Sequence, residues 1–199
     1  MEFSGLFVSF RKIEPDDIER VADWLHSDVF RENLYAIPLD KGMSKKDIVI
    51  DFIKKNSDDY HPDKYFVIEE KKNKNLVGLT LFNNLDWKNR TVEYNYIIGD
   101  PARRNGIYGS DISLAICNYA FNSLNLNKVI GYTYEFNKQA QRVNNFIADV
   151  EGVLVAHHKH QGRYIDVIIH SLSKRKFSSF IKENKELMLR KYYKYGIFQ

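Results

Sequence analysis

The stretch from residue 91 to residue 136 constrains the fold most, because its pattern changes from strand to helix and back to strand. Residues 91–98 have the composition of a strand, and the loop 101–109 that follows carries two glycines. The next apolar residues recur at i, i+3, i+4, i+7 and i+8, which predicts a helix, and residues 129–136 form a second strand. A strand–helix–strand unit closes as a right-handed crossover, so the two strands should be parallel neighbours. Parallel strands that diverge at their carboxyl ends leave a cleft in which a ligand can bind.

Outside this unit the hydrophobic pattern predicts five more strands and four more helices. Residues 28–43 lack a clear period, and Pro38 and Gly42 mark a loop there. The whole order, βααβββαβαββα, predicts an α/β fold with one mixed sheet and helices on its faces. The additional strands are expected at 7–13, 65–69, 76–82, 153–159 and 164–170, and the additional helices at 14–25, after the N-cap Ser44, at 137–147 and at 177–195.

Length and composition fit one soluble domain. The chain has 199 residues, of which 44% are hydrophobic and 14% aromatic, more than a disordered chain contains. No apolar run approaches the 18 residues of a membrane span, and residues 1–10 lack the features of a secretory signal. The single cysteine, Cys117, cannot form an internal disulfide or a Cys-based zinc site, so a reduced cytoplasmic compartment is expected.

The positive charge is concentrated in the C-terminal tail. From Lys174 onward there are eight Lys or Arg and two Glu, a net charge of +6, and because the total is +4 the body carries −2. Nucleic acid is therefore not an expected partner, and the tail reads as a solvated helix face. We divide the chain into a domain, 1–173, and a basic helical extension, 174–199. Its stripe of Phe177, Phe180 and Ile181 should pack on the domain or on a second subunit.

The loop before the predicted helix has the chemistry of a phosphate site. The first turn of a helix offers unpaired N–H groups and the positive end of a dipole, and Arg103 and Arg104 add positive charge. The alternative is an ordinary strand-to-helix loop, in which Gly106 and Gly109 only let the chain turn.

Five segments in a fixed order resemble one family. Arg104 to Gly109 resembles the acetyl-CoA motif Q/R-x-x-G-x-G/A of the GCN5-related N-acetyltransferases (GNAT). The other four segments are similar to the ribosomal-protein-alanine and spermidine acetyltransferase branch: 93–96, Asp100-Pro101, 137–143, and the closing hairpin of 151–154 with 162–166. The resemblance covers roughly residues 7–172. It implies a mostly antiparallel central sheet with one parallel splayed pair, helices on both faces, and an added C-terminal helix.

The resemblance also implies an activity and a set of site residues. The activity is direct transfer of an acetyl group from the co-substrate acetyl-CoA to a primary amine, which can be a protein N-terminus, a polyamine, an amino sugar or another small amine. The oxyanion of the thioester would be bound by a backbone N–H near Tyr96, Ile97 or Ile98. Asn137 would hold the pantetheine arm. Arg103, with the backbone of Arg104, Asn105, Gly106, Ile107, Tyr108, Gly109 and Ser110, would bind the diphosphate.

Two residues depart from the family pattern. Ile107 occupies the first glycine position of the motif, so the diphosphate contacts can be rearranged. Asn144 stands where many members have a tyrosine that protonates the thiolate, seven residues after Asn137. Solvent would then do that task. These departures support an alternative function, a coenzyme A-binding module with impaired catalysis; a third reading is an adaptor that uses its basic tail.

Glu93 is the candidate catalytic base, with an ion-paired or exposed strand glutamate as the alternative. For the acceptor amine the candidates are Trp24, Phe30, Tyr35 and Asp166, although the three aromatics can equally be core residues and Asp166 can instead brace the hairpin. No metal is expected, because His157 points away from His158 and His160 on a strand. A homodimer is a possible assembly.

Overall fold

The structure, a computed structural model, describes residues 2–28, 30 and 43–194; for residues 185–194 it describes the backbone alone. It contains one sheet of eight strands in the order β1-β2-β3-β4-β5-β6-β8-β7. Every neighbouring pair is antiparallel except β5 and β6. The strands are β1 Phe3–Ser4, β2 Val8–Lys12, β3 Lys64–Glu70, β4 Leu76–Asp86, β5 Thr91–Ile98, β6 Lys128–Tyr134, β7 Asp149–His160 and β8 Arg163–Ser173.

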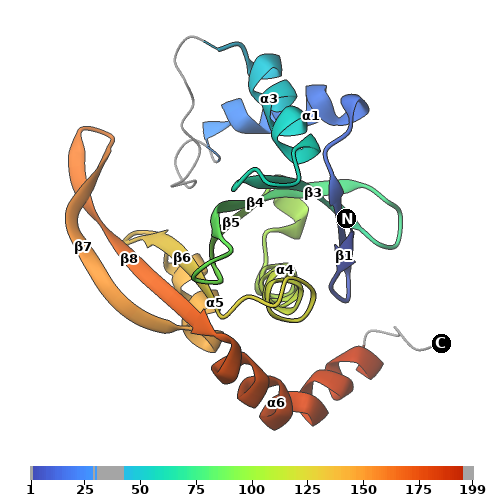
Figure 1. Ribbon diagram of the computed structural model, residues 1–199, viewed down its shortest axis with the longest axis vertical. Helices are drawn as coiled ribbons and strands as arrows, with labels where there is room; N and C mark the ends of the chain where they lie inside the picture. The colour runs from blue at the N-terminus through green and yellow to red at the C-terminus, as the bar shows by residue number, and fades with distance from the viewer. Residues whose placement is uncertain (1, 29, 31–42, 195–199) are drawn as a thin grey trace.

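Helices cover both faces of the sheet (Figure 1). Among the described residues, two helices lie on one face and two on the other, and the helix α6 follows β8 directly. Short 3-10 turns, Pro15–Asp17 and Pro101–Arg103, precede the first and third of the helices that follow, and a π-turn, Tyr119–Ser123, extends the third. The helices are α1 Ile18–His26 and α3 Lys45–Ser57 on the first face, α4 Gly106–Asn118 and α5 Lys138–Ile147 on the second, and α6 Lys174–Lys194. The predicted mixed sheet with one parallel pair is confirmed.

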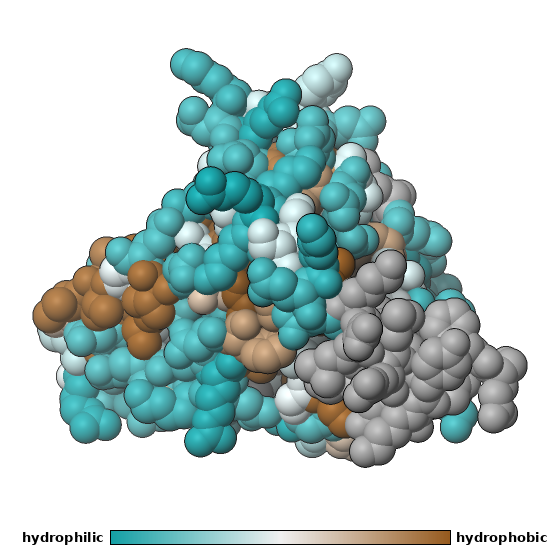
Figure 2. Space-filling model, turned by 90° about the horizontal axis from the view of Figure 1, so that it is seen from below, coloured by the Kyte–Doolittle hydropathy of each residue, from teal (hydrophilic) through white to brown (hydrophobic). Residues whose placement is uncertain are grey.

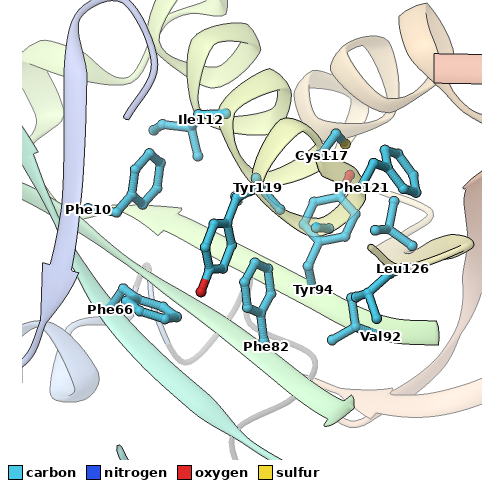
Figure 3. Packing of buried hydrophobic residues seen from close by; sticks show 14 of the residues in the cluster. Phe10, Phe66, Phe82, Val92, Tyr94, Ile112, Cys117, Tyr119, Phe121 and Leu126 are labelled. Carbon is cyan, nitrogen blue, oxygen red and sulfur yellow. The ribbon is translucent and has the colours of Figure 1, made fainter. Parts of the chain in front are cut away.

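Each face of the sheet has its own hydrophobic core. The core on the α4 side gathers side chains from β2, β3, β4, β5, α4 and the π-turn and loop that follow α4, and Figure 3 labels some of them. The core on the α1 and α3 side is separate. Alternate residues of β5 supply the two cores: Val92 and Tyr94 point to α4, whereas Ile97 points to α1 and α3.

Two elements at the ends of the chain were not fully foreseen. The short strand β1 was missed, because two residues give no periodic signal; its Phe3 stacks on Phe10 and on Tyr119, each at 4.2 Å between ring centroids. The expected tail helix begins three residues earlier than the pattern suggested, at Lys174. Its Phe177 is buried against Phe121, as expected of the aromatic stripe. The division at residue 173 into two domains stays a prediction.

The surface on the α6 side is mainly hydrophilic, with hydrophobic side chains gathered at one side, where the β7–β8 hairpin lies (Figure 2). Val155 on that hairpin is 77% exposed. Within the described residues, no helix is both long and apolar enough to cross a membrane.

Candidate active site

The site is built where β5 and β6 part. Their parallel pairing stops at Glu93 opposite Ile130. Beyond that point β5 stays paired with β4 as far as Ile98, and β6 stays paired with β8 as far as Tyr134. The divergence opens a cleft of about 230 Å³, lined by residues 94–98 of β5, 131–134 of β6, the start of α4 and one side of α5. The cleft predicted from the strand–helix–strand unit is therefore present.

At one end of this cleft the loop before α4 is tied to the end of β5. The Arg104 guanidinium donates from Nε to the carbonyl of Ile98 and from Nη2 to that of Gly99, both at 2.9 Å. The Asp100 side chain accepts from the Ala102 N–H at 2.9 Å. The Arg104 guanidinium thus binds backbone carbonyls of its own chain with two N–H groups. These two bonds fix the direction in which α4 leaves the strand.

Arg103 is neutralised by a carboxylate from another strand. Its guanidinium donates to both oxygens of Glu70 at the end of β3, at 3.0 and 2.8 Å, and the Tyr108 hydroxyl donates to the same carboxylate. Glu70 is only 8% exposed. Arg103 and then Tyr108 lower the pKa of Glu70 to about 2, and burial together with Glu70 raises the pKa of Tyr108 to about 12. This cluster braces the loop but reduces the charge that Arg103 offers to an anion.

The first amides of α4 are capped from within. The Asn105 side-chain oxygen accepts from the N–H groups of Ile107 and Tyr108, both at 3.1 Å. A Cβ added to Gly106 would meet nothing within 4 Å, so open space lies beside this turn. Ser110 follows in the helix and does not line the cleft.

The hydroxyl of Tyr96 lies under the first turn of α4. It donates to the Gly109 carbonyl and accepts from the Ser113 hydroxyl, each at 3.2 Å. A Cβ on Gly109 would lie 3.4 Å from that hydroxyl, so the small residue permits the close approach of helix and strand. The Tyr96 hydroxyl therefore binds α4. At this position β5 contributes its backbone to the wall of the cleft.

The helix α5 forms the opposite wall. The Asn137 side chain caps it by accepting from the Ala140 N–H at 3.1 Å, and both residues line the cleft. Gln141 donates to the carbonyls of Tyr134 and Glu135, at 3.0 and 2.8 Å. These bonds fix the start of α5 to the end of β6.

At the far end of the cleft, where the strands separate, polar side chains lie on both faces of β5. Glu93 accepts from the hydroxyl of Tyr132, which lines the cleft, at 3.2 Å. On the other face of β5, the Tyr94 hydroxyl lies 3.5 Å from the Asn144 side-chain oxygen. The Asn144 nitrogen donates to the Thr133 hydroxyl at 2.9 Å. Glu93 therefore lies beside the cleft and contacts a lining residue, Tyr132, and it forms no ion pair with any residue that the structure describes.

The acceptor candidates do not meet at the cleft. Trp24 and Phe30 are buried and stacked on each other at 6.1 Å in the α1–α3 core. Trp24 also fills the space over Gly99, where an added Cβ would come within 2.4 Å of the indole. Asp166 accepts from the Ala156 N–H at 2.8 Å, which is the bracing alternative. Tyr35 lies outside the described residues.

The histidines of the hairpin form an aromatic group. The His158 ring approaches the Tyr134 hydroxyl at 3.1 Å, and the ring centroid of His160 lies 4.7 Å from that of Phe136. No group of three His, Cys, Asp or Glu able to hold a metal occurs among the residues that the structure describes. Cys117 is fully buried, and burial raises the pKa of its thiol to about 12, so it is not a nucleophile.

Several residues of the site were not singled out as site residues from the sequence, among them Glu70, Tyr94, Gly131, Tyr132 and Thr133. Glu70 comes from a strand 33 residues before its partner Arg103, and no local pattern links them. Tyr94, Gly131 and Tyr132 lie on strands whose alternation was recognised, but their approach to the cleft depends on where β5 and β6 part. A count of hydroxyl-bearing residues on these two strands would have been a usable signal.

Both the sequence and the structure of this chain resemble those of known proteins. A family model described as an acetyltransferase (GNAT) domain matches residues 8–145. An uncharacterized N-acetyltransferase p20 of Bacillus licheniformis is 31% identical over 114 residues, which are 57% of this chain and 64% of the relative. The chain thus spans a little under two thirds of the length of that curated relative.

Solved structures share the fold. The spermidine N-acetyltransferase of Vibrio cholerae in complex with CoA and spermine has a TM-score of 0.75 at 22% identity, and the match covers 85% of this chain and 97% of that one. The spermidine/spermine N-acetyltransferase of the same organism in complex with manganese ions has a TM-score of 0.72 at 21% identity, over 87% and 96% of the two chains. The match of the family model to residues 8–145, on a sheet that parts in this way, establishes that the chain belongs to the GNAT acetyltransferase family.

Proposed function

We propose that this chain transfers an acetyl group from acetyl-CoA to a small cationic primary amine by direct attack. The observation that carries the proposal is the cleft between β5 and β6, which joins the N-terminus of α4 to the point where the strands separate beside Glu93. The end of the cleft at the start of α4 suits the diphosphate of coenzyme A. The end near Glu93 suits the transfer of the acetyl group to an amine that has lost its proton.

The start of α4 fits the diphosphate of coenzyme A. The helix has 13 residues, so its first amides carry the positive end of a full dipole. The open space at Gly106 leaves room for a phosphate. Phosphate oxygens are stronger acceptors than an amide oxygen, so a bound diphosphate would displace the Asn105 side chain from the amides of Ile107 and Tyr108. Asn137, across the cleft, is placed to contact the pantetheine arm.

The backbone of β5 fits the acyl group. Where β6 no longer pairs with β5, alternate N–H groups of β5 face the cleft rather than a partner strand. One of these, in the stretch 96–98, would donate to the oxyanion that forms when the thioester carbonyl is attacked.

Glu93 would accept the proton of the amine. An amine with a pKa of about 10.4 is almost wholly protonated at pH 7, and the neutral form costs about 4.6 kcal/mol. A carboxylate at the point where β5 and β6 stop pairing can take that proton directly or through a water molecule. Tyr132 holds one oxygen of Glu93 at 3.2 Å and leaves the second for the amine.

The acidic body, with its net charge of −2, favours a cation, and the Vibrio cholerae protein that shares the fold was crystallised with spermine. A polyamine is accordingly the first acceptor to test, ahead of a protein N-terminus and an amino sugar.

A second candidate is a coenzyme A-binding module without catalysis. Asn144 favours it, because an amide side chain cannot supply a proton to the departing thiolate. The Asn105 cap also favours it, because it occupies the N–H groups of Ile107 and Tyr108 at the start of α4.

Two measurements test these proposals. Thermal melting with acetyl-CoA at 100 times its Kd should show stabilisation of about 2.7 kcal/mol. Release of free thiol should then be followed with spermidine, spermine, an amino sugar and an N-terminal peptide. An unmoved melting curve would refute both candidates, whereas a shifted curve without thiol release would leave only the binding module.

A further inference from the structure

Tyr94 occupies the end of the cleft where the two strands part. It follows Glu93, the last residue of β5 that pairs with β6, and points toward α4 beside Cys117 (Figure 3). It is 6% exposed and is one of the residues that line the cleft. A Cβ on Gly131 of β6 would lie 3.4 Å from the Tyr94 ring, so the glycine gives the ring its place.

The hydroxyl of Tyr94 is held by a long hydrogen bond to another residue that lines the cleft. Its hydrogen-bond acceptor is the Asn144 side-chain oxygen at 3.5 Å, a long distance for this kind of bond. The Asn144 amide is oriented by its nitrogen, which donates to Thr133 at the ordinary distance of 2.9 Å. The amide therefore keeps its oxygen toward Tyr94, and a stronger acceptor that enters the cleft can take the phenolic hydrogen.

We propose that the Tyr94 hydroxyl is the donor to the departing sulfur of coenzyme A, so that β5 supplies the acid that position 144 of α5 lacks. This inference rests on the proposed function. Tyr94 is then a catalytic residue, and Asn144 and Thr133 are positioning residues that aim its hydroxyl.

The step balances as follows. The amine nitrogen, having lost a proton to Glu93, forms a bond to the carbonyl carbon. The C–S bond breaks with its electron pair on sulfur, and Tyr94 donates its proton, or the hydrogen bond that precedes the transfer, to that sulfur. The nitrogen, now bonded to the carbonyl carbon, releases its second proton to water, and water returns a proton to the Tyr94 oxygen. The amide and free thiol are the products, and the proton taken by Glu93 goes to solvent.

The surroundings keep Tyr94 protonated and therefore able to donate. Burial raises the pKa of its hydroxyl well above the usual value. The nearest titratable groups, Cys117 on α4 and Tyr96 on β5, are buried as well, and burial raises the pKa of each.

The first test compares Tyr94→Phe with Tyr119→Phe. Both variants remove a phenolic oxygen from a buried ring on the α4 side, but Tyr119 lies outside the cleft. General acid catalysis contributes about 10²–10⁴-fold, so kcat of thiol release should fall at least about tenfold in Tyr94→Phe. The melting shift with acetyl-CoA should persist in this variant, and Tyr119→Phe should keep kcat within about twofold.

The second test does not depend on turnover. By calorimetry at pH 9, wild type should bind coenzyme A more tightly than desulfo-coenzyme A, and Tyr94→Phe should lower this preference by about fivefold, the effect of one hydrogen bond. A merely structural role would change both affinities alike. An unchanged kcat, or an unchanged preference for the sulfur, would overturn the role of Tyr94 while leaving the proposed function standing. A wild-type chain that binds acetyl-CoA but releases no thiol would refute both.

Discussion

The two ends of the cleft are held together by opposite kinds of interaction. At the α4 end the chain uses charge: Glu70 pairs with Arg103, and Arg104 clamps the carbonyls that end β5. At the other end, where β5 and β6 separate (the split end), the contacts are between neutral oxygens and amides, with Glu93 as the acidic group. In the proposed function, charge thus fixes the part of the cleft that would receive the highly charged donor, while proton donors and acceptors lie where protons would be transferred.

The difference also separates stability from catalysis. An ion pair with a buried carboxylate keeps one geometry and resists change, whereas long bonds such as that between Tyr94 and Asn144 can be exchanged for bonds to a substrate. Substitutions at the α4 end should therefore act on folding and on donor affinity. Those at the split end should act on turnover.

The largest effect is expected at Glu93. Glu93→Gln keeps the shape and the bond to Tyr132 but removes the proton acceptor, so kcat should fall about a hundredfold with donor affinity unchanged. Thiol-release kinetics with the best amine acceptor measure this. The matched control is Glu151→Gln, which removes a carboxylate paired with Lys128 away from the cleft. If the two variants turned over equally fast, Glu93 would have no part in the reaction.

Glu70 should show the opposite behaviour. Glu70→Gln leaves Arg103 without its charged partner, and the free energy of unfolding should fall by about 1–3 kcal/mol. Chemical denaturation at pH 7 measures this loss. A comparable loss of kcat at saturating substrates, with stability intact, would show that charge at this end serves catalysis after all.

Acid should remove the stabilisation that the Glu70 carboxylate gives to the folded chain. The pKa of Glu70 is about 2 in the folded chain and 4.5 ordinarily, so its stabilisation is fully present above pH 4.5 and is lost as the pH falls toward 2. Denaturation curves of wild type and Glu70→Gln should therefore differ at pH 6 and converge toward pH 2. A difference that stayed constant across this range would rule out the carboxylate as its source.

The smallest effect, of opposite sign on two properties, is expected at Asn105. Asn105→Ala removes the cap of α4, which should cost about 1 kcal/mol of stability. It also frees the amides of Ile107 and Tyr108, so affinity for acetyl-CoA should rise severalfold. Denaturation and calorimetry on the same sample test both signs, and a weaker affinity would show that the Asn105 side chain itself binds the donor.

Local patterns in the sequence were sufficient to predict the α4 end of the cleft. A strand, a glycine-bearing loop and a helix are contiguous between residues 91 and 118, and the crossover rule makes β5 and β6 neighbours. The cap at Ser44 was likewise local, because its side chain accepts from the Asp47 N–H at 3.2 Å. Such features depend on residues a few positions apart.

The split end depends on contacts between distant residues and could not be predicted in detail. Tyr94 and Asn144 are 50 positions apart, and Glu93 and Tyr132 are 39 apart. The position at which β5 and β6 cease to pair decides which of their side chains enter the cleft, and alternation alone does not give that position. Trp24 and Phe30 could not be placed from the sequence for a similar reason. The sequence pattern of an aromatic residue is the same whether it lines a site or fills the core.

Calorimetric titration of acetyl-CoA into Gly106→Asp and Gly106→Ala tests the central claim most directly. Neither side chain meets an obstacle at its Cβ, and an acidic residue in the first turn is compatible with the helix dipole, so both variants should fold. If the diphosphate lies at the start of α4, repulsion of about 3 kcal/mol should weaken binding to Gly106→Asp by about a hundredfold relative to Gly106→Ala. Equal affinity in the two variants would contradict the placement of the donor in this cleft.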